Sequence, residues 1–208
     1  MVMFADRVDA GRRLTERLLT FRGEGTIILA IPRGGVVVGR VVAEQLGAEL
    51  DIVIPRKMGA PGNPELAIGA VMHDGTMILN EDVLEMMDVP QSYIDEEKKK
   101  QMSEARRRME TYRRGKPYPS LKGRVVIIVD DGIATGATVA VAARWVKAQQ
   151  PSRTVVAVPV GPPDSIKRLK NEADEVIYIL APAYFYAVGQ FYDDFSQVED
   201  EDVINLLK

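Results

Sequence analysis

The sequence predicts an α/β fold in which helices flank a mostly parallel sheet. Apolar runs rich in β-branched residues, the pattern of strands buried on both faces, occur at 26–31, 125–129 and 154–160. Helix-like segments alternate with these runs, which favours parallel strands joined by right-handed crossovers. With 208 residues, of which 46% are hydrophobic, the chain is long enough for one sizeable core. We therefore expect a single domain over residues 1–208.

The composition excludes several classes of site. Lysine and arginine total 27 against 30 aspartates and glutamates, so no basic excess points to nucleic acid. No apolar run approaches the ~18 residues of a membrane span, and the first residues lack the apolar core of a signal peptide. There is no cysteine, and His73 is the single histidine, which excludes thiolate and multi-histidine metal sites. We expect a cytoplasmic protein that acts through carboxylates, basic side chains and backbone amides.

The first elements follow one another as helix, strand, helix and strand. An amphipathic pattern predicts a helix over 6–19, which Gly23 and Gly25 end. The next strand, helix and strand are expected at 26–31, 36–46 and 50–54. Residues 56–65 hold two prolines and two glycines and are expected to form a loop.

A hairpin and a long helix come next. The Asp-Gly pair after His73 predicts a hairpin between strands 67–72 and 77–79, and a catalytic role for this lone histidine is not expected. A helical insertion is predicted at about 82–114, where glutamates pair with Lys or Arg at i,i+4. Its arginine run 106–108 could be a nucleic-acid patch, but interleaved glutamates favour a solvated face. The remaining elements are a helix, a strand, a helix and a last strand at 139–147, 154–160, 165–169 and 176–179.

The most informative stretch joins the strand 125–129 to the helix that follows it. Asp130 and Asp131 stand at the carboxyl end of this strand, where ligands bind in open α/β sheets. The small-residue loop that follows opens a helix, and unpaired amides at a helix start suit a phosphate. Carboxylates instead accept hydrogen bonds from hydroxyls. A sugar diol next to a phosphate would therefore suit both the two acids and the loop that follows them. The loop residues are Gly132, Ile133, Ala134, Thr135, Gly136, Ala137 and Thr138.

This stretch resembles the phosphoribosyl-diphosphate (PRPP) motif of type I phosphoribosyltransferases. The shared pattern is a hydrophobic strand, two acids and a Gly-x-Ala-Thr-Gly-x-Thr loop, and it is neither a Walker A nor a Gly-x-Gly-x-x-Gly loop. A generic strand-to-helix turn is the plainer alternative. The resemblance implies the type I phosphoribosyltransferase fold, with a small hood over the sheet and the long helix as an insertion. It also implies that residues 132–138 hold the 5′-phosphate and that Asp130 and Asp131 hold the ribose hydroxyls.

Two earlier loops carry basic residues for the diphosphate. Arg33, Gly34 and Gly35 follow the first strand, and a glycine-flanked guanidinium suits phosphate oxygens. By resemblance this is the family's pyrophosphate loop, so a non-proline cis peptide is expected at the bond between Arg33 and Gly34 or at its neighbour. Residues 56–65 resemble the family's flexible loop, in which Arg56 and Lys57 would meet the departing diphosphate. A helix-entry turn and a structural surface loop are the alternatives.

The C-terminal segment, about 181–208, is expected to form the hood. Aromatic residues and acids concentrate in 181–195, and rings can stack on a flat base. By similarity to hypoxanthine–guanine phosphoribosyltransferases, the candidate base-binding residues are Tyr186, Val188 and Phe191. Asp193 would hold Mg²⁺ through water. A packing cluster over the sheet edge is the competing interpretation of these rings.

The sequence predicts a phosphoribosyltransferase that moves the phosphoribosyl group of PRPP to a nitrogenous base and releases diphosphate, with Mg²⁺ as cofactor. Hypoxanthine–guanine enzymes carry an acid at the position of Ala134, so the accepting base is left unassigned. One alternative is a regulator that senses PRPP or a nucleotide without turnover, and another is hydrolysis or phosphorolysis of a nucleotide in the same pocket. The expected partners are PRPP and a nucleobase-like molecule, with no nucleic acid or membrane and with a homodimer as a possibility.

Overall fold

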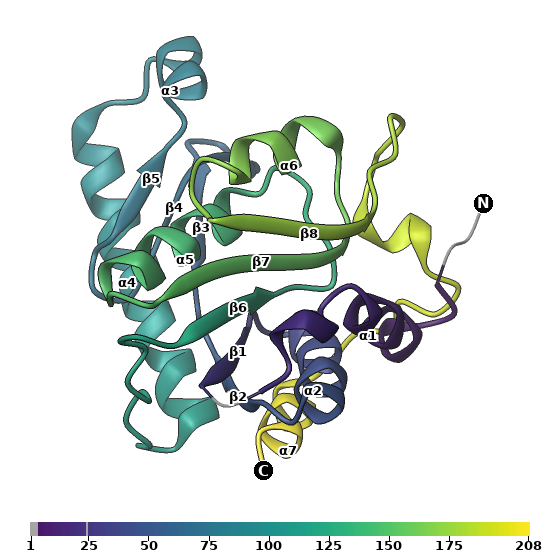
Figure 1. The fold of residues 1–208 in the computed structure, drawn as a ribbon. Helices are drawn as coiled ribbons and strands as arrows, with labels where there is room; N and C mark the ends of the chain where they lie inside the picture. The colour runs from purple at the N-terminus through teal and green to yellow at the C-terminus, as the bar shows by residue number, and fades with distance from the viewer. Residues whose placement is uncertain (1–3, 24) are drawn as a thin grey trace.

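The computed structural model describes residues 4–23 and 25–208 and contains two sheets (Figure 1). The larger sheet has five parallel strands in the order β2-β1-β6-β7-β8. These strands are β1 (Thr26–Ala30), β2 (Glu49–Ile52), β6 (Val125–Val129), β7 (Arg153–Val160) and β8 (Glu175–Leu180). The prediction of a mostly parallel sheet between helices is therefore confirmed.

Alternation along the strands divides the core between the two faces of this sheet. Ile27 and Leu29 pack against one set of helices, whereas Ile28 packs against the other. The first set is α5 (Ala137–Ala148) and α6 (Pro163–Leu169), and the second is α1 (Arg7–Glu16) and α2 (Gly34–Leu46). Both faces are covered, which explains why the strands are continuous apolar runs.

The second sheet is antiparallel and has three strands in the order β3-β4-β5. The strands are β3 (Arg56–Ala60), β4 (Asn63–Val71) and β5 (Met77–Leu79), and the turn with His73 joins the last two as expected. The loop expected at 56–65 is instead a β-hairpin with its turn at Pro61 and Gly62. Burial explains the difference, because Met58 and Ile68 pack with Ile94 of the long helix and hold the segment in a sheet.

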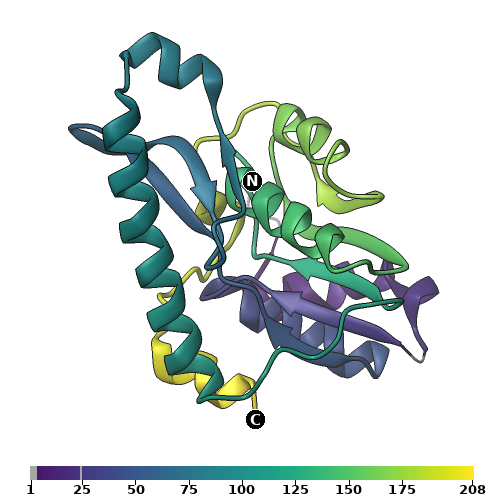
Figure 2. The same cartoon turned by 90° about the vertical axis from the view of Figure 1, so that its left-hand side faces the viewer.

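The insertion contains a short helix, α3 (Glu81–Met87), and a long one, α4 (Gln91–Arg113). Figure 2 shows α4 running along the antiparallel sheet and ending beside α7 (Asp200–Leu206), a helix that the sequence analysis did not anticipate. The short 3₁₀ helices η1 (Leu19–Phe21) and η2 (Val188–Phe191) complete the described elements.

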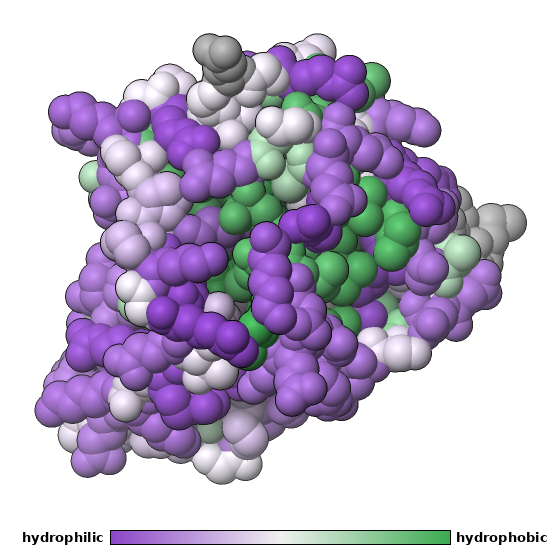
Figure 3. All heavy atoms as spheres, turned by 90° about the horizontal axis from the view of Figure 1, so that it is seen from below, coloured by the Kyte–Doolittle hydropathy of each residue, from purple (hydrophilic) through white to green (hydrophobic). Residues whose placement is uncertain are grey.

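The side of the molecule on which α7 and the C-terminus lie is mostly hydrophilic, with apolar atoms gathered near its middle (Figure 3). Val203 of α7 is fully buried against Val36 and Tyr112. Leu206 and Leu207 pack at the border of the same cluster. The last helix thus closes a small core between α2 and α4. Over the described ranges 4–23 and 25–208, no helix is long and apolar enough to span a membrane.

Thr154 of β7 provides a test of the core. Its side chain is fully buried, and within the described part of the chain its hydroxyl has no hydrogen-bond partner. A buried, unpaired hydroxyl costs about 1–3 kcal/mol, so Thr154→Val is expected to raise the free energy of unfolding by about 1 kcal/mol or more. Denaturant titration measures the change, and Val156→Thr on the same strand should have the opposite sign. An unchanged or lower stability of Thr154→Val would show that the hydroxyl is bonded.

Candidate functional site

Two carboxylates form the centre of the site, at the carboxyl end of β6. The Asp130 carboxylate accepts a hydrogen bond from the backbone N–H of Asp131 at 2.8 Å. Burial raises the pKa of Asp130 well above its usual range, and the neighbouring charge of Asp131 raises it further. Burial also raises the pKa of Asp131, although Arg7 opposes this shift. The pair therefore holds protons more tightly than ordinary carboxyls do, and a hydroxyl-bearing ligand would meet acids largely shielded from water.

Arg7 is the cation that compensates this pair, and the sequence analysis missed it. Its Nε lies 2.8 Å from Oδ2 of Asp131, and both side chains are less than 15% exposed. The same guanidinium donates to the carbonyl of Ser196 and stacks on the ring of Phe195, 3.9 Å from the ring centroid. Arg7 is the first residue of α1, where the helix dipole disfavours a cation. That local inconsistency is the one signal in the sequence that could have pointed to a tertiary role.

The loop with Arg33, Gly34 and Gly35 lies directly against the acids. A Cβ on Gly34 would overlap the carboxylate of Asp131, and one on Gly35 would lie 2.9 Å from Cα of Asp130. Only glycine fits at these positions, so the backbone at the start of α2 approaches the acid pair closely. The peptide bond between Pro32 and Arg33 is cis, at the neighbour of the Arg33–Gly34 bond. The structure thus brings together two motifs separated by about a hundred residues.

Residues 132–138 lead from the acids into the N-terminus of α5. Gly136 has φ of 77°, a left-handed conformation that favours glycine, and the helix begins at the next residue. The hydroxyl of Ser165 donates to the carbonyl of Ala134 at 2.6 Å, and Arg168 donates to that of Thr135 at 3.3 Å. Both loop residues are exposed. The first amides of α5 lack intrahelical partners, so the loop offers donors to an anion.

The hood residues divide into two groups. Val188 lies over the start of the loop 132–138, because a Cβ on Gly132 would overlap its side chain. Phe191, in contrast, is 7% exposed and packs with Phe4 and Tyr192, an environment typical of a core residue. Tyr186 is 89% exposed, and the structure does not place its ring against the other candidate residues. Of the three base-binding candidates, Val188 contacts the loop 132–138, Phe191 is buried in a hydrophobic cluster and Tyr186 is exposed.

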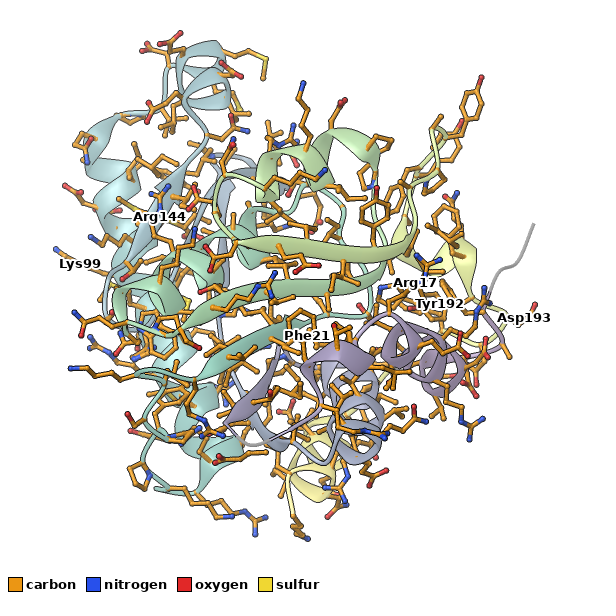
Figure 4. The ribbon with its side chains drawn as sticks, viewed as in Figure 1. Arg17, Phe21, Lys99, Arg144, Tyr192 and Asp193 are labelled. Carbon is orange, nitrogen blue, oxygen red and sulfur yellow. The ribbon has the colours of Figure 1, made fainter. Side chains whose placement is uncertain are left out.

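Tyr192 and Asp193 lie beside α1 (Figure 4). The Tyr192 hydroxyl donates to the carbonyl of Asp131 at 2.5 Å, and burial raises the pKa of this tyrosine. The chain is extended at Tyr192, so the side chain of Asp193 points to the opposite side, and it is exposed. The structure therefore does not bring Asp193 to the acid pair. Across residues 4–23 and 25–208, no group of three or more His, Asp or Glu side chains is arranged around a metal position.

The basic residues of the hairpin also lie apart from one another. Lys57 pairs with Glu65 across the hairpin at 3.1 Å, and both are exposed enough for this contact to be weak. Arg56 donates to Gln101 of α4 at 3.1 Å, while Arg33 lies 3.6 Å from both Glu199 and Asp200 at the start of α7. In this structure every predicted phosphate-binding cation thus contacts another side chain of the chain.

Comparisons with known proteins agree with this geometry. Residues 6–196 match a family model described as the phosphoribosyl transferase domain. A protein of Mycobacterium tuberculosis H37Rv, named provisionally as a phosphoribosyl transferase, is 44% identical over 207 residues, which cover 100% of this chain and 47% of that protein. The chain thus spans about half the length of the curated relatives it matches.

Solved structures show the same fold. The crystal structure of a Thermus thermophilus protein is 47% identical with a TM-score of 0.83, covering 99% of this chain and 98% of that one. A hypothetical protein from Neisseria gonorrhoeae, solved with bound ppGpp, has a TM-score of 0.50 at 13% identity and covers 100% of this chain and 96% of that one. At that identity the likeness concerns the fold alone.

Proposed function

Because the chain belongs to the phosphoribosyl transferase domain family, we propose that it transfers the 5-phosphoribosyl group of PRPP to a nitrogenous base and releases diphosphate. The observation that carries this proposal is the contact of Gly34 and Gly35 with the acid pair. A ligand on the acids is then next to backbone amides of the pyrophosphate loop. A ribose with a phosphate at one end and a diphosphate at the other fits this arrangement.

The proposed binding mode follows from the donors and acceptors of the site. Asp130 and Asp131 would accept hydrogen bonds from the ribose 2′- and 3′-hydroxyls, each worth about 1.5–3 kcal/mol because the acceptor is charged. Amides and hydroxyls of residues 132–138 would bind the 5′-phosphate at the N-terminus of α5. Arg33 and the amides of Gly34 and Gly35 would bind the diphosphate, and Arg56 and Lys57 would approach it from the hairpin.

The proposed reaction is a displacement at C1 of the ribose. A ring nitrogen of the base forms a bond to C1, the bond from C1 to the diphosphate oxygen breaks, and the electron pair leaves with the diphosphate. The proton of the attacking nitrogen passes to solvent. Negative charge grows on the departing oxygen, and preorganised cations and amides stabilise that charge. Positioning by the two phosphate sites supplies the remaining rate enhancement.

Mg²⁺ fits this site as an ion held mainly by the substrate. The available ligands are carboxylate oxygens, which suit Mg²⁺, and this ion usually binds through one or two carboxylates plus substrate phosphates. Asp193 could reach it through water, in which case its exposed position requires the ion to lie at the rim of the site. When bound, Mg²⁺ would neutralise charge on the diphosphate.

A second candidate function is sensing of PRPP or a nucleotide without turnover. The observation that favours it is the pairing of Asp131 with Arg7 and of Arg33 with α7, because a ligand would have to replace these internal contacts. Binding would then rearrange the N-terminal and C-terminal segments.

The accepting base is unassigned, since Ala134 supplies no acid and Tyr186 is not placed against the loop.

The test is calorimetric titration with PRPP and Mg²⁺, followed by a panel of nucleobases with detection of diphosphate. We expect PRPP to bind with micromolar affinity and one base to trigger release of diphosphate. Binding without release on any base would favour the sensor. Release of diphosphate or ribose 5-phosphate without a base would indicate hydrolysis, and no binding would contradict the assignment of the central motif.

A further inference from the structure

One face of α4 carries polar groups toward the pyrophosphate loop. Gln101, Glu104, Arg108 and Tyr112 recur at spacings of three and four residues and therefore share a side of the helix. Arg56 donates to Gln101 from the start of β3, at 3.1 Å. At the other end of this face, the Tyr112 hydroxyl donates to Oδ1 of Asp200 at 2.7 Å. The inserted helix is thus in contact with both the hairpin and α7.

The Asp200 carboxylate that accepts from Tyr112 also connects α4 to the pyrophosphate loop. Arg33 Nη1 lies 3.6 Å from Oδ1 of Asp200, the oxygen that Tyr112 contacts, and 3.6 Å from Oε2 of Glu199. Arg33 is followed by Gly34 and Gly35, which touch the acid pair. A path therefore leads from the acids over the glycine amides to Arg33 and on to α4. A diphosphate attached to C1 of a ribose on the acids would extend along this path.

Arg107 and Arg108 lie on the part of α4 between Gln101, which Arg56 contacts, and Tyr112, which shares Asp200 with Arg33. We refer to Arg33, Arg56, Arg107 and Arg108 as the guanidinium cluster. Glu104 pairs with Arg107 at 2.8 Å and with Arg108 at 2.7 Å, and these bonds lower its pKa to about 2. Burial lowers the pKa of Arg56, and the nearby positive charge of Arg108 lowers it further. Arginine stays protonated at any ordinary pH. Arg56 and Arg108 therefore repel each other at any ordinary pH, although Glu104 opposes this effect.

The carboxylates paired directly with the cluster are shared or exposed. Glu104 is shared between Arg107 and Arg108, whereas Glu199 and Asp200 pair with Arg33. Glu199 is 62% exposed and Asp200 is 47% exposed, and ion pairs of such exposed groups are weak. A phosphate offers more acceptor oxygens than a carboxylate and pairs bidentately with guanidinium. It would therefore displace the α7 acids from Arg33.

We propose that Arg107 and Arg108 of α4 bind the diphosphate of PRPP together with Arg33 and Arg56. The inserted helix is then part of the substrate site, and the arginine run that the sequence analysis assigned to a solvated face has a binding role. Arg108 is the stronger candidate because it is 28% exposed, against 60% for Arg107. The identity of the ligand rests on the proposed function, whereas the affinity of the cluster for a diphosphate does not.

The test is calorimetric titration of inorganic pyrophosphate with Mg²⁺ into the wild-type chain, Arg108→Gln and Arg107→Gln. Loss of one guanidinium–phosphate contact is expected to weaken binding about tenfold or more in Arg108→Gln, and less in Arg107→Gln. The matched control is Lys99→Gln, which removes the same charge from the same helix. Figure 4 shows Lys99 pointing away from the molecule. The affinity of the Lys99→Gln variant for pyrophosphate should therefore stay within about twofold of wild type. Ribose 5-phosphate lacks the diphosphate, so its affinity should be unchanged in all three variants.

Each outcome decides a different point. An unchanged pyrophosphate affinity in folded Arg108→Gln, or an equal loss in Lys99→Gln, overturns the role of α4. If Arg108→Gln fails to fold by circular dichroism, Arg108→Lys keeps the charge but not the planar fork, and its affinity should fall below wild type. Unchanged affinity there also overturns the proposal. Pyrophosphate binding that depends on Arg108, without transfer from PRPP to any base, supports the cluster and rejects the transferase. Transfer from PRPP to a base that does not change in Arg108→Gln supports the transferase and rejects the role of the cluster.

Discussion

Arg7→Met is expected to lower the free energy of unfolding by about 3–5 kcal/mol near pH 8, because it leaves the buried carboxylate of Asp131 without its cation. The loss should shrink as the pH falls. Without Arg7, the pKa of Asp131 rises further above its usual range, so the folded state takes up a proton at a higher pH and escapes the uncompensated charge. Denaturant titrations between pH 8 and pH 5 measure both the size and the trend.

The control for this experiment is Arg12→Met, a change of the same type at an exposed position of α1. Its effect should stay within about 0.5 kcal/mol at every pH. PRPP affinity of Arg7→Met should also fall as the pH is lowered toward 5, since a protonated Asp131 accepts hydroxyl hydrogen bonds poorly. A stability loss of equal size at all pH values would mean that Arg7 acts through packing on Phe195 rather than through charge.

Asp130→Asn is expected to have opposite effects on stability and on binding. The amide oxygen can keep the hydrogen bond from the backbone N–H of Asp131, while the buried charge disappears. Because the pKa of Asp130 is raised in the folded state, the folded chain binds more protons than the unfolded chain above the ordinary carboxyl range. The wild-type stability therefore falls as the pH rises through that window. The variant should be more stable than wild type at pH 8, with a flatter pH dependence.

PRPP affinity of Asp130→Asn should fall about tenfold to a hundredfold, the effect of losing a charge-assisted hydrogen bond to a ribose hydroxyl. Asp82→Asn, at an exposed position of α3, should alter neither quantity. Unchanged PRPP affinity with raised stability would contradict the diol assignment, whereas lowered stability at pH 8 would contradict the burial of a charged carboxyl. The two measurements therefore fail independently.

Patterns confined to one strand and its loop were predictable from the sequence. The apolar run 125–129 became β6 with the same bounds, because a strand buried on both faces needs no partner information to be recognised. The sequence also indicated that Gly34, Gly35 and Gly136 are required by the backbone. Gly34 and Gly35 allow close approach to the acids, and Gly136 adopts a left-handed conformation.

Contacts between distant segments were not predictable. The segment 56–65 has the composition of a loop, yet packing against α4 makes it a hairpin. Arg7 and Ser196 are 189 residues apart, and nothing near either residue indicates the other. Arg106 and Arg107 are exposed, as the interleaved glutamates predict, but the proximity of Arg108 to Arg56 of another element is not visible in the local pattern. Helix periodicity identifies a face but does not say what lies opposite.

The pairing of the first described residues with the hood has a consequence for biosynthesis. Phe4 donates from its backbone to Phe191, and Asp193 and Asp194 donate back to Phe4 and Ala5. During synthesis, the N-terminal segment leaves the ribosome long before residues 191–196 have been made. The elements β1, α2 and β6 can therefore assemble before Arg7 can contact Phe195 and Ser196. Contacts of such high sequence separation form late in folding. The chain should therefore acquire most of its sheet during synthesis and its ligand-binding competence only after residue 196 has emerged.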